Sequence, residues 1–243
     1  MNIDKVLDRY PNKGRGVDYE VDVVSLKDGG KGIFKGNMKA DPYSIIPLKE
    51  ALAYKVDQFM NFNLVPETEI VWFEGRAGSL QRFVNGVDGQ KAIIQNSFNP
   101  SFEEMQKLAI FDFVFNNCDR WTVNFLLEED GSVHAIDNAG CFQNRDTSSC
   151  TIYYLLGQKI TEKNLVIINQ LMKNCKELCE LMLSFEYEPL EDGKKVSFKE
   201  LFSDSVRLTT NHIYLLAGSQ GWVQNINYKL GLIAPEELGV KMK

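Results

Sequence analysis

The chain has 243 residues, of which 44% are hydrophobic and 25% charged, and its formal net charge is -6. These proportions are ordinary for a globular protein and exclude a disordered or collagen-like chain. The acidic excess argues against a nucleic-acid-binding surface and against electrostatic attachment to anionic lipid. No apolar run approaches the ~18 residues that cross a bilayer, and the polar first residues lack the apolar stretch of a secretory signal. We therefore expect a cytoplasmic protein without a stable membrane anchor.

The cysteines and histidines disfavour a zinc site or a disulfide framework. The five cysteines are irregularly spaced and form no CxxC pair, and the two histidines, His134 and His212, are far apart in the sequence. Zinc sites and disulfide frameworks show closely spaced or paired residues of these types. We expect buried free thiols in a reducing compartment.

The first part of the chain has the pattern of strands and turns around one helix. Residues 19–26 alternate apolar and polar side chains, and a Gly-rich turn leads to a returning strand at 32–35, which predicts a hairpin. Pro47 opens an amphipathic helix that runs to about Asn61. A second hairpin is predicted from strands at 69–73 and 79–84.

The rest of the chain has mostly helical patterns. Ser101 and Glu104 predict a capping box at the start of an apolar helix. A short hairpin follows, with strands at 124–128 and 132–136. Further helical patterns lie at 161–184, 198–202 and 205–217.

These elements predict an α+β fold with two lobes. Residues 1–85 would form a small β-rich N-lobe and residues 86–243 a larger α-helical C-lobe, joined by a Gly- and Asp-containing connector at 85–90. Together the lobes would make one domain.

A candidate site follows the capped helix. Asp119 and Asn124 have the D-x-x-x-x-N spacing, and Asp137 lies 13 residues later, at the exit of the predicted hairpin. In a phosphotransferase this spacing places one carboxylate at the acceptor hydroxyl and an amide at magnesium. Asx turns and a strand end would explain the same residues. The position of the motif between a helix and a hairpin that ends in Asp favours the catalytic interpretation.

Two upstream residues add to this pattern. Lys35 closes a predicted strand, and Glu50 lies 15 residues later in the first turn of the helix. A strand lysine can neutralise nucleotide phosphates, and a helix glutamate can orient its amine. A solvated lysine and a glutamate that complements the helix dipole are the alternatives for each residue alone.

Five stretches of the chain, within roughly Gly32 to Phe142, resemble the phosphatidylinositol 3-/4-kinase-like superfamily: GIFKGNMKADPY, KEALAYKVDQFMNFNLVPETEIVWF, GSLQRFV, FDFVFNNCDRWTVNFLL and HAIDNAGCF. The nearest likeness is to type II phosphatidylinositol 4-kinases and related bacterial proteins. A weaker one extends to actin-fragmin-type and HipA-like atypical protein kinases. The resemblance implies a two-lobed atypical protein-kinase-like fold that binds ATP and Mg²⁺.

The resemblance also implies a role for each candidate residue. Lys35 would bind phosphate with Glu50 as its partner, and Asp119 would act as the catalytic base. Asn124 and Asp137 would be magnesium ligands. The remaining nucleotide contacts would come from the hinge and the adenine pocket, at Gln81, Phe83, Val84 and Ile136.

The sequence departs from the family pattern at two places. Ala139 stands where the family has glycine after Asp-Asn, and Trp121 stands where many relatives have His or Gly. The phosphate-loop glycines are weakly marked, and Gly14 and Gly16 are the best candidates.

The acceptor is left open by these motifs. A Ser or Thr hydroxyl of a protein is favoured over a lipid, because the chain is acidic and has no cysteine between Lys35 and Glu50 for acyl anchoring. A phosphatidylinositol 4-kinase-like lipid kinase, an AMP transferase and a non-catalytic nucleotide-binding module are the alternatives. The expected partners are therefore ATP and a protein acceptor, without nucleic acid. Autophosphorylation could involve Thr147, Ser148, Ser149 or Thr151.

Overall fold

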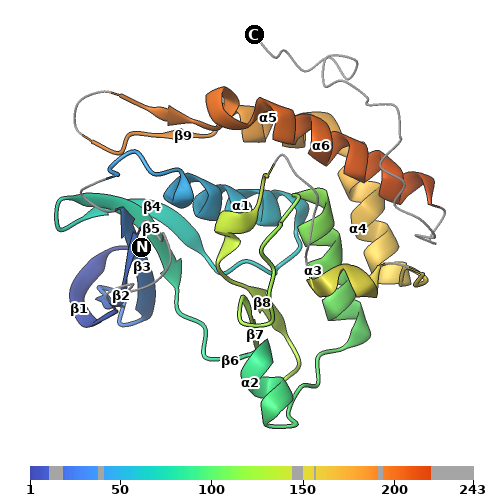
Figure 1. Ribbon diagram of the computed structural model, residues 1–243, viewed down its shortest axis with the longest axis horizontal. Coiled ribbons are helices and arrows are strands. Elements are labelled where there is room, and N and C mark those ends of the chain that lie inside the picture. Colours follow the sequence, from blue (N-terminus) through green and yellow to red (C-terminus); the bar gives the residue numbers. More distant parts are fainter. Residues whose placement is uncertain (11–18, 38–40, 144–149, 156, 191–193, 220–243) are drawn as a thin grey trace.

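The computed structural model describes residues 1–10, 19–37, 41–143, 150–155, 157–190 and 194–219 (Figure 1). It confirms an α+β protein, in which a five-stranded sheet formed by residues 3–82 precedes a part of the chain that is mostly helical. The division into two lobes at 85–90 stays a prediction. Within the described residues, no helix is both long enough and apolar enough to cross a membrane.

A five-stranded antiparallel sheet occupies the first part of the chain, in the order β1-β2-β3-β5-β4. Its strands are β1 (Ile3–Tyr10), β2 (Tyr19–Leu26), β3 (Lys31–Asn37), β4 (Thr68–Phe73) and β5 (Arg76–Arg82). Both predicted hairpins are present. β1 is absent from the sequence analysis, because two register shifts against β2 interrupt the period-two pattern that marks a strand.

The turn between β4 and β5 is shorter than predicted. It contains only Glu74 and Gly75, both at positive φ, which is the conformation of a tight hairpin turn. β5 therefore begins at Arg76 instead of Ser79.

The two faces of β3 have different surroundings. Phe34 is fully buried in a small apolar cluster with Val24, Leu26 and Leu80. Because successive side chains in a strand point to opposite faces, Lys35 lies on the other side of the sheet.

Helix α1 (Ile46–Met60) links the sheet to the helices of the second half. It contacts β4, β5 and α5 (Cys175–Ser184). Its apolar residues belong to the main core together with side chains of the later helices. Pro47 lies in its first turn, as predicted, and the helix ends at Asn61 in the left-handed conformation. This packing fixes the position of the charged residues that α1 carries.

A three-stranded sheet with the order β6-β7-β8 lies beside the helices, away from the first sheet (Figure 1). The elements here are β6 (Val87–Asp88), α2 (Gly89–Ile94), α3 (Phe102–Val114), β7 (Phe125–Leu127) and β8 (Val133–Ala135). The predicted cap is present, since the Ser101 hydroxyl accepts the Glu104 N–H at 3.1 Å. The D-x-x-x-x-N motif therefore lies between the end of α3 and the start of β7.

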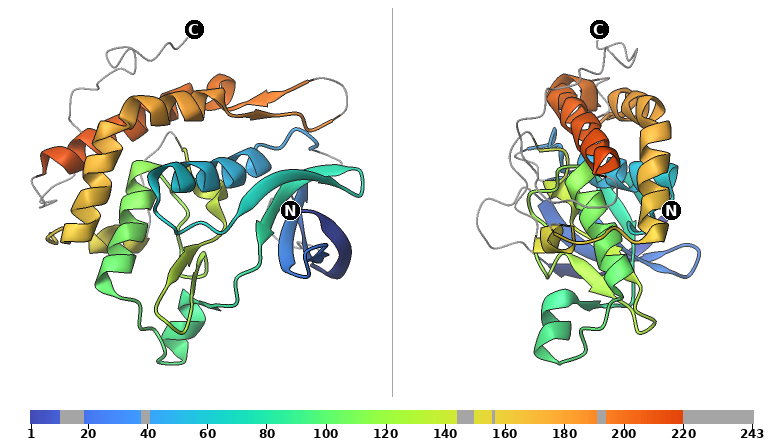
Figure 2. Two further views of the ribbon diagram at one scale, coloured as in Figure 1. Left: turned by 180° about the vertical axis from the view of Figure 1, so that it is seen from behind. Right: turned by 90° about the vertical axis from the view of Figure 1, so that its right-hand side faces the viewer.

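The predicted helix at 161–184 is two helices, α4 (Glu162–Lys173) and α5, which Figure 2 shows at a steep angle to each other. Leu171 and Cys175 are both buried, so the apolar pattern continues across the bend at Asn174 and hides it. Conversely, α6 (Phe198–Gly218) is one helix where two were predicted. A short hairpin of β9 (Glu186–Tyr187) and β10 (Val196–Ser197) joins α5 to α6.

Candidate active site

Three predicted site residues from distant parts of the chain meet at one point. The Lys35 amine on β3 lies 2.6 Å from Glu50 Oε1 on α1 and 2.9 Å from Asp137 Oδ1, two residues after β8. Glu50 is buried, whereas Lys35 and Asp137 remain partly open to solvent. The amine is therefore held by two carboxylates, one from the core and one from the surface.

Helix α1 also holds the segment that carries Asp137. The Asn138 N–H donates to Glu50 Oε2 at 3.0 Å, and the buried Lys49 amine donates to the Ala139 carbonyl at 3.2 Å. Asp137 itself has left-handed backbone angles, with φ 53° and ψ 60°, which are uncommon for a residue with a side chain. Neighbouring residues of α1 thus fix the backbone that presents the Asp137 carboxylate.

Ala139, at the position where the superfamily that the chain resembles has glycine, fits this backbone. Ala139 lies in η1 (Asn138–Gly140) and is not among the residues at positive φ. The close approach occurs at Gly140, where a Cβ would lie 2.6 Å from Asn117 Oδ1 and 2.7 Å from Asp119 Cβ. The glycine that this turn requires is therefore Gly140.

Asp119 and Asn124 are joined by the loop between them. Asn124 Nδ2 donates to the Asp119 carbonyl at 2.7 Å. The Asp119 N–H donates to Asn117 Oδ1, and the Trp121 indole N–H donates to Asp119 Oδ1 at 2.7 Å. Because Asn124 Nδ2 donates a hydrogen bond within the loop, Oδ1 is the side-chain atom that can coordinate a cation. Asp119 is exposed, so its second oxygen can meet an acceptor.

The sequence analysis assigned no role to Arg120. In the structure its side chain forms hydrogen bonds that hold the loop together. It is fully buried. Its guanidinium donates to Asp112 at 3.0 Å, to the Asn124 and Ile136 carbonyls at 2.6 Å, and to Asn138 Oδ1 at 2.7 Å. Burial is the strongest influence and opposes its charge, but Asp112 together with Cys141 and Asp137 outweighs burial and raises the pKa of Arg120. One charged group therefore ties the Asn124 loop to the Asp137 segment.

The Asp112 carboxylate has a further partner in Thr151, the second residue of η2 (Cys150–Tyr154). The Thr151 hydroxyl is buried and donates to Asp112 Oδ2 at 2.8 Å. In this arrangement it is no acceptor for phosphate. The other candidate modification sites, Thr147, Ser148 and Ser149, and the candidate loop glycines Gly14 and Gly16 lie outside the described residues.

The predicted nucleotide-contacting residues occupy different environments. The Gln81 side chain is buried and donates to Thr68 Oγ1 at 3.0 Å. The Phe83 N–H donates to the Lys31 carbonyl at 3.0 Å. Val84 is half-buried, and its N–H has no hydrogen-bond partner among the described residues. Ile136 is half-buried, and its N–H donates to the Asn124 carbonyl.

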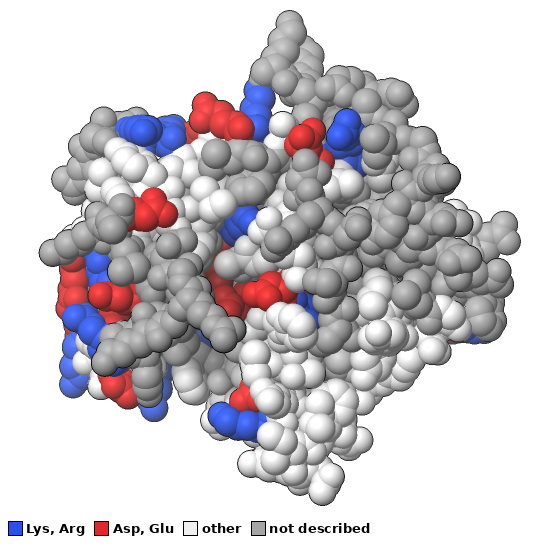
Figure 3. Space-filling model, in the orientation of Figure 1, with Lys and Arg blue, Asp and Glu red and all other residues white. Residues whose placement is uncertain are grey.

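The donor set at this site suits magnesium. Asn124 Oδ1 and the partly exposed Asp137 carboxylate are hard oxygen ligands, and Mg²⁺ commonly takes one or two protein ligands with the rest from water and phosphate. In the described part of the chain, no group of three or more His, Cys, Asp and Glu residues could hold a metal. Figure 3 shows acidic side chains near the centre of the face drawn.

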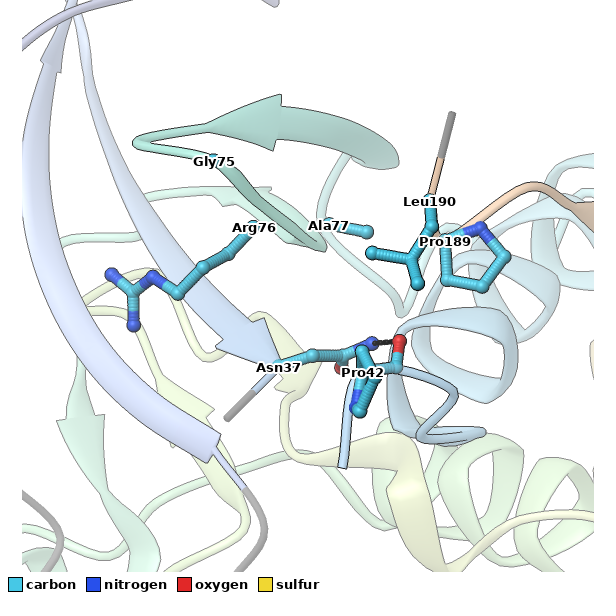
Figure 4. A pocket seen from close by; sticks show the side chains of 7 residues that line it. All are labelled: Asn37, Pro42, Gly75, Arg76, Ala77, Pro189 and Leu190. Carbon is cyan, nitrogen blue, oxygen red and sulfur yellow. Dashed lines mark hydrogen bonds between the residues drawn. The ribbon is translucent and has the colours of Figure 1, made fainter. Parts of the chain in front are cut away.

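Figure 4 shows a pocket of about 200 Å³. None of the predicted site residues lines it. Its lining consists of Asn37, Pro42, Gly75, Arg76, Ala77, Pro189 and Leu190.

Comparisons with known proteins leave the family open. No family model matches the chain, and no curated protein matches it. Among solved structures, the proinflammatory kinase CtkA of Helicobacter pylori is similar over 90% of this chain and 94% of that one, at 12% identity and a TM-score of 0.39. A likeness this weak assigns neither fold nor function, so the contacts described above carry the interpretation.

Proposed function

We propose that this protein is an ATP- and Mg²⁺-dependent phosphotransferase that phosphorylates Ser or Thr hydroxyls of a protein. The observation that carries the proposal is the contact of Lys35 with both Glu50 and Asp137, at 2.6 and 2.9 Å. A lysine held beside a metal-binding carboxylate is suited to polyphosphate, because it can neutralise oxygens that the metal also binds. The motif spacing and the family resemblance support the same reaction.

The nucleotide would lie against the sheet face that carries Lys35. Val21, Val23 and Ile33 share this face by strand alternation and are half-buried, so they offer apolar surface to a purine. The Phe83 carbonyl and the Val84 N–H would meet the adenine edge. Gln81 would support this strand from within, since its amide is engaged with Thr68.

Asn124 and Asp137 would hold Mg²⁺ between the loop and the phosphates. When bound, the ion neutralises charge on the phosphate oxygens and keeps them in place for transfer. Glu50 keeps the Lys35 amine in position, and Arg120 keeps the two ligand-bearing segments at a constant distance. The protein's contribution is therefore mainly positioning and charge compensation.

Asp119 would orient the acceptor hydroxyl and receive its proton. The acceptor oxygen forms a bond to the γ-phosphorus while the bond from that phosphorus to the β,γ-bridging oxygen breaks, and ADP leaves with the electron pair. The exposed position of Asp119 allows a polypeptide to reach it. An acidic chain and an acidic site favour a protein over an anionic lipid headgroup.

The test is product mass after incubation with ATP, Mg²⁺, a mixed protein pool and phosphatidylinositol vesicles. The variants are Asp119→Ala and Asp137→Ala, with Asp204→Ala as a matched control on the surface of α6, where it pairs with Arg207. We expect a gain of about 80 Da on protein, lost in both site variants and kept in the control.

Other outcomes would overturn parts of the proposal. Phosphate on lipid would change the acceptor, and a gain of about 329 Da would identify AMP transfer. Nucleotide binding without transfer would indicate a non-catalytic module. If Asp137→Ala were as active as the unsubstituted protein, the proposed site would be wrong.

A further inference from the structure

Trp121 combines two properties that packing does not explain. Its indole N–H donates to Asp119 Oδ1 at 2.7 Å, and 58% of the residue is exposed to solvent. An exposed ring of this size loses the hydrophobic stabilisation that burial would give it. Because the indole contacts Asp119, the proposed base, we relate its exposed position to the reaction.

The loop backbone holds the ring and the carboxylate together. The Trp121 N–H donates to the Asp119 carbonyl at 3.0 Å, and the Asn124 N–H donates to the Trp121 carbonyl at 2.9 Å. The indole hydrogen bond occupies Oδ1 and restricts rotation of the carboxylate. Asp119 Oδ2 is then the oxygen presented to an acceptor, since the indole N–H occupies Oδ1.

The exposed ring lies where an acceptor must pass. Any group that brings its hydroxyl to Asp119 also approaches Trp121, because the indole is hydrogen-bonded to the same carboxylate. Val123 adds a second exposed apolar side chain on the same loop. Tryptophan is enriched in the central contacts of protein interfaces because its ring buries a large area. An apolar side chain of a polypeptide fits this surface, whereas a phosphorylated lipid headgroup beside Asp119 would meet like charge.

We propose that Trp121 is a positioning and specificity residue of the acceptor site. Its indole N–H fixes the Asp119 carboxylate, and its ring binds a large apolar side chain next to the acceptor Ser or Thr. This inference rests on the proposed function and extends it to the choice of acceptor.

Two substitutions separate the two roles. Trp121→Phe keeps an aromatic ring and removes the N–H, whereas Trp121→Gln keeps an N–H donor and removes the ring. Trp72→Phe is the matched control, because Trp72 is also exposed and donates its indole N–H, to the Glu188 carbonyl at 3.3 Å. The acceptors are Ser peptides that differ only in the flanking residues, which are Leu, Phe, Ala, Asp or Lys. Hydrolysis of ATP, with water as acceptor, is measured in parallel.

We expect Trp121→Phe to lower kcat about tenfold, for peptides and for water, with the KM for ATP unchanged. We expect Trp121→Gln to raise the KM for Leu- and Phe-flanked peptides about tenfold while that of the Ala-flanked peptide changes little. Trp72→Phe should match the unsubstituted protein in both assays.

Equal kcat for Trp121→Phe and the unsubstituted protein would remove the positioning role. An unchanged peptide preference in Trp121→Gln would remove the specificity role, as would lipid phosphorylation or ATP hydrolysis without phosphorylation of any peptide. If the unsubstituted protein neither transfers phosphate nor hydrolyses ATP, and Asp137→Asn behaves identically, the proposed function fails first and this inference falls with it.

Discussion

At the scale of single residues, Glu50 shows how one buried carboxylate serves two partners. Its Oε1 accepts from the Lys35 amine and its Oε2 from the Asn138 N–H. Both oxygens must accept, and no neutral side chain of the same shape can do this. The two hydrogen bonds therefore require a carboxylate at position 50.

We predict that Glu50→Gln lowers the free energy of unfolding by about 1–3 kcal/mol, because its amide leaves either Lys35 or Asn138 without an acceptor. The transfer rate should fall at least tenfold, since Lys35 loses its fixed position. Urea unfolding and kcat measure the two effects. Glu67→Gln is the control, because its ion pair with Arg82 is at the surface and such pairs contribute about 0–1 kcal/mol. Equal losses in the two variants would contradict the prediction.

At the scale of elements, the loop at 119–124 and the segment after β8 form one unit through Arg120. Two backbone carbonyls, an amide oxygen and the Asp112 carboxylate share its planar guanidinium. A lysine keeps the charge but cannot reach all these acceptors from one ammonium group.

We predict that Arg120→Lys lowers the free energy of unfolding by about 3 kcal/mol, because buried acceptors lose their donors. Nucleotide binding should need several-fold more Mg²⁺, since Asn124 and Asp137 are no longer held at a constant distance. Calorimetric titration at several Mg²⁺ concentrations measures this requirement. Arg82→Lys, at a partly exposed ion pair, should change neither quantity. An unaltered Mg²⁺ requirement in Arg120→Lys would limit Arg120 to stability.

The β9–β10 hairpin supports the start of α1. The Tyr187 hydroxyl donates to the Ser44 carbonyl and accepts from Asn37 Nδ2, at the end of β3. Burial raises the pKa of Tyr187 to about 12, so the hydroxyl keeps its proton. One side chain therefore links the strand that carries Lys35 to the helix that carries Glu50.

We predict that Tyr187→Phe reduces the transfer rate several-fold and raises the KM for ATP, because the distance between β3 and α1 is less restrained. The free energy of unfolding should fall by about 1–2 kcal/mol. Steady-state kinetics over a range of ATP concentrations checks the first effect. Tyr153→Phe, at a strongly exposed position, is expected to be neutral. An identical KM in Tyr187→Phe would show that α1 is held by its core packing alone.

At the scale of the whole molecule, two buried groups act in opposite directions on the pH dependence of stability. His212 stacks on Phe113 at 4.3 Å between ring centroids, and burial lowers its pKa to about 4. Burial raises the pKa of Asp57 to about 6, against hydrogen bonds from the Leu64 and Val65 N–H groups. Between pH 6 and 4, protonation therefore favours the unfolded state through His212 and the folded state through Asp57.

We predict that His212→Gln flattens the loss of stability on acidification. The pKa of His212 is lower in the folded than in the unfolded state, so its contribution is complete above about pH 6.5 and declines toward pH 4. Lowering the pH from 7 to 4.5 should cost the unsubstituted protein about 2 kcal/mol more than the variant, with the Asp57 effect common to both. Urea unfolding across this range is the measurement. Parallel stability curves would show that His212 is not buried neutral.

Local patterns in the sequence were sufficient to predict most helices and strands and to identify the candidate site residues along the chain. Strand alternation, the Ser101 cap and the Pro47 helix start depend on neighbours within a few residues, so they were predictable. β1, the bend at Asn174 and the short β4–β5 turn were not. In each case the deciding interaction was a bulged pairing, a change of packing direction or a pair of positive φ angles, which apolar periodicity does not reveal.

The sequence by itself determined which residue types were available for the proposed phosphoryl transfer, and their spacing along the chain. Only the tertiary structure decided that Lys35, Glu50 and Asp137 meet, because contacts across 102 positions depend on how α1 packs between the sheet and the later helices. It also showed the hydrogen bonds that Arg120 and Trp121 make, which the motif spacing does not predict. Hydrogen bonds to backbone carbonyls and to one carboxylate oxygen depend on distances and directions between atoms that are set only when the chain has folded.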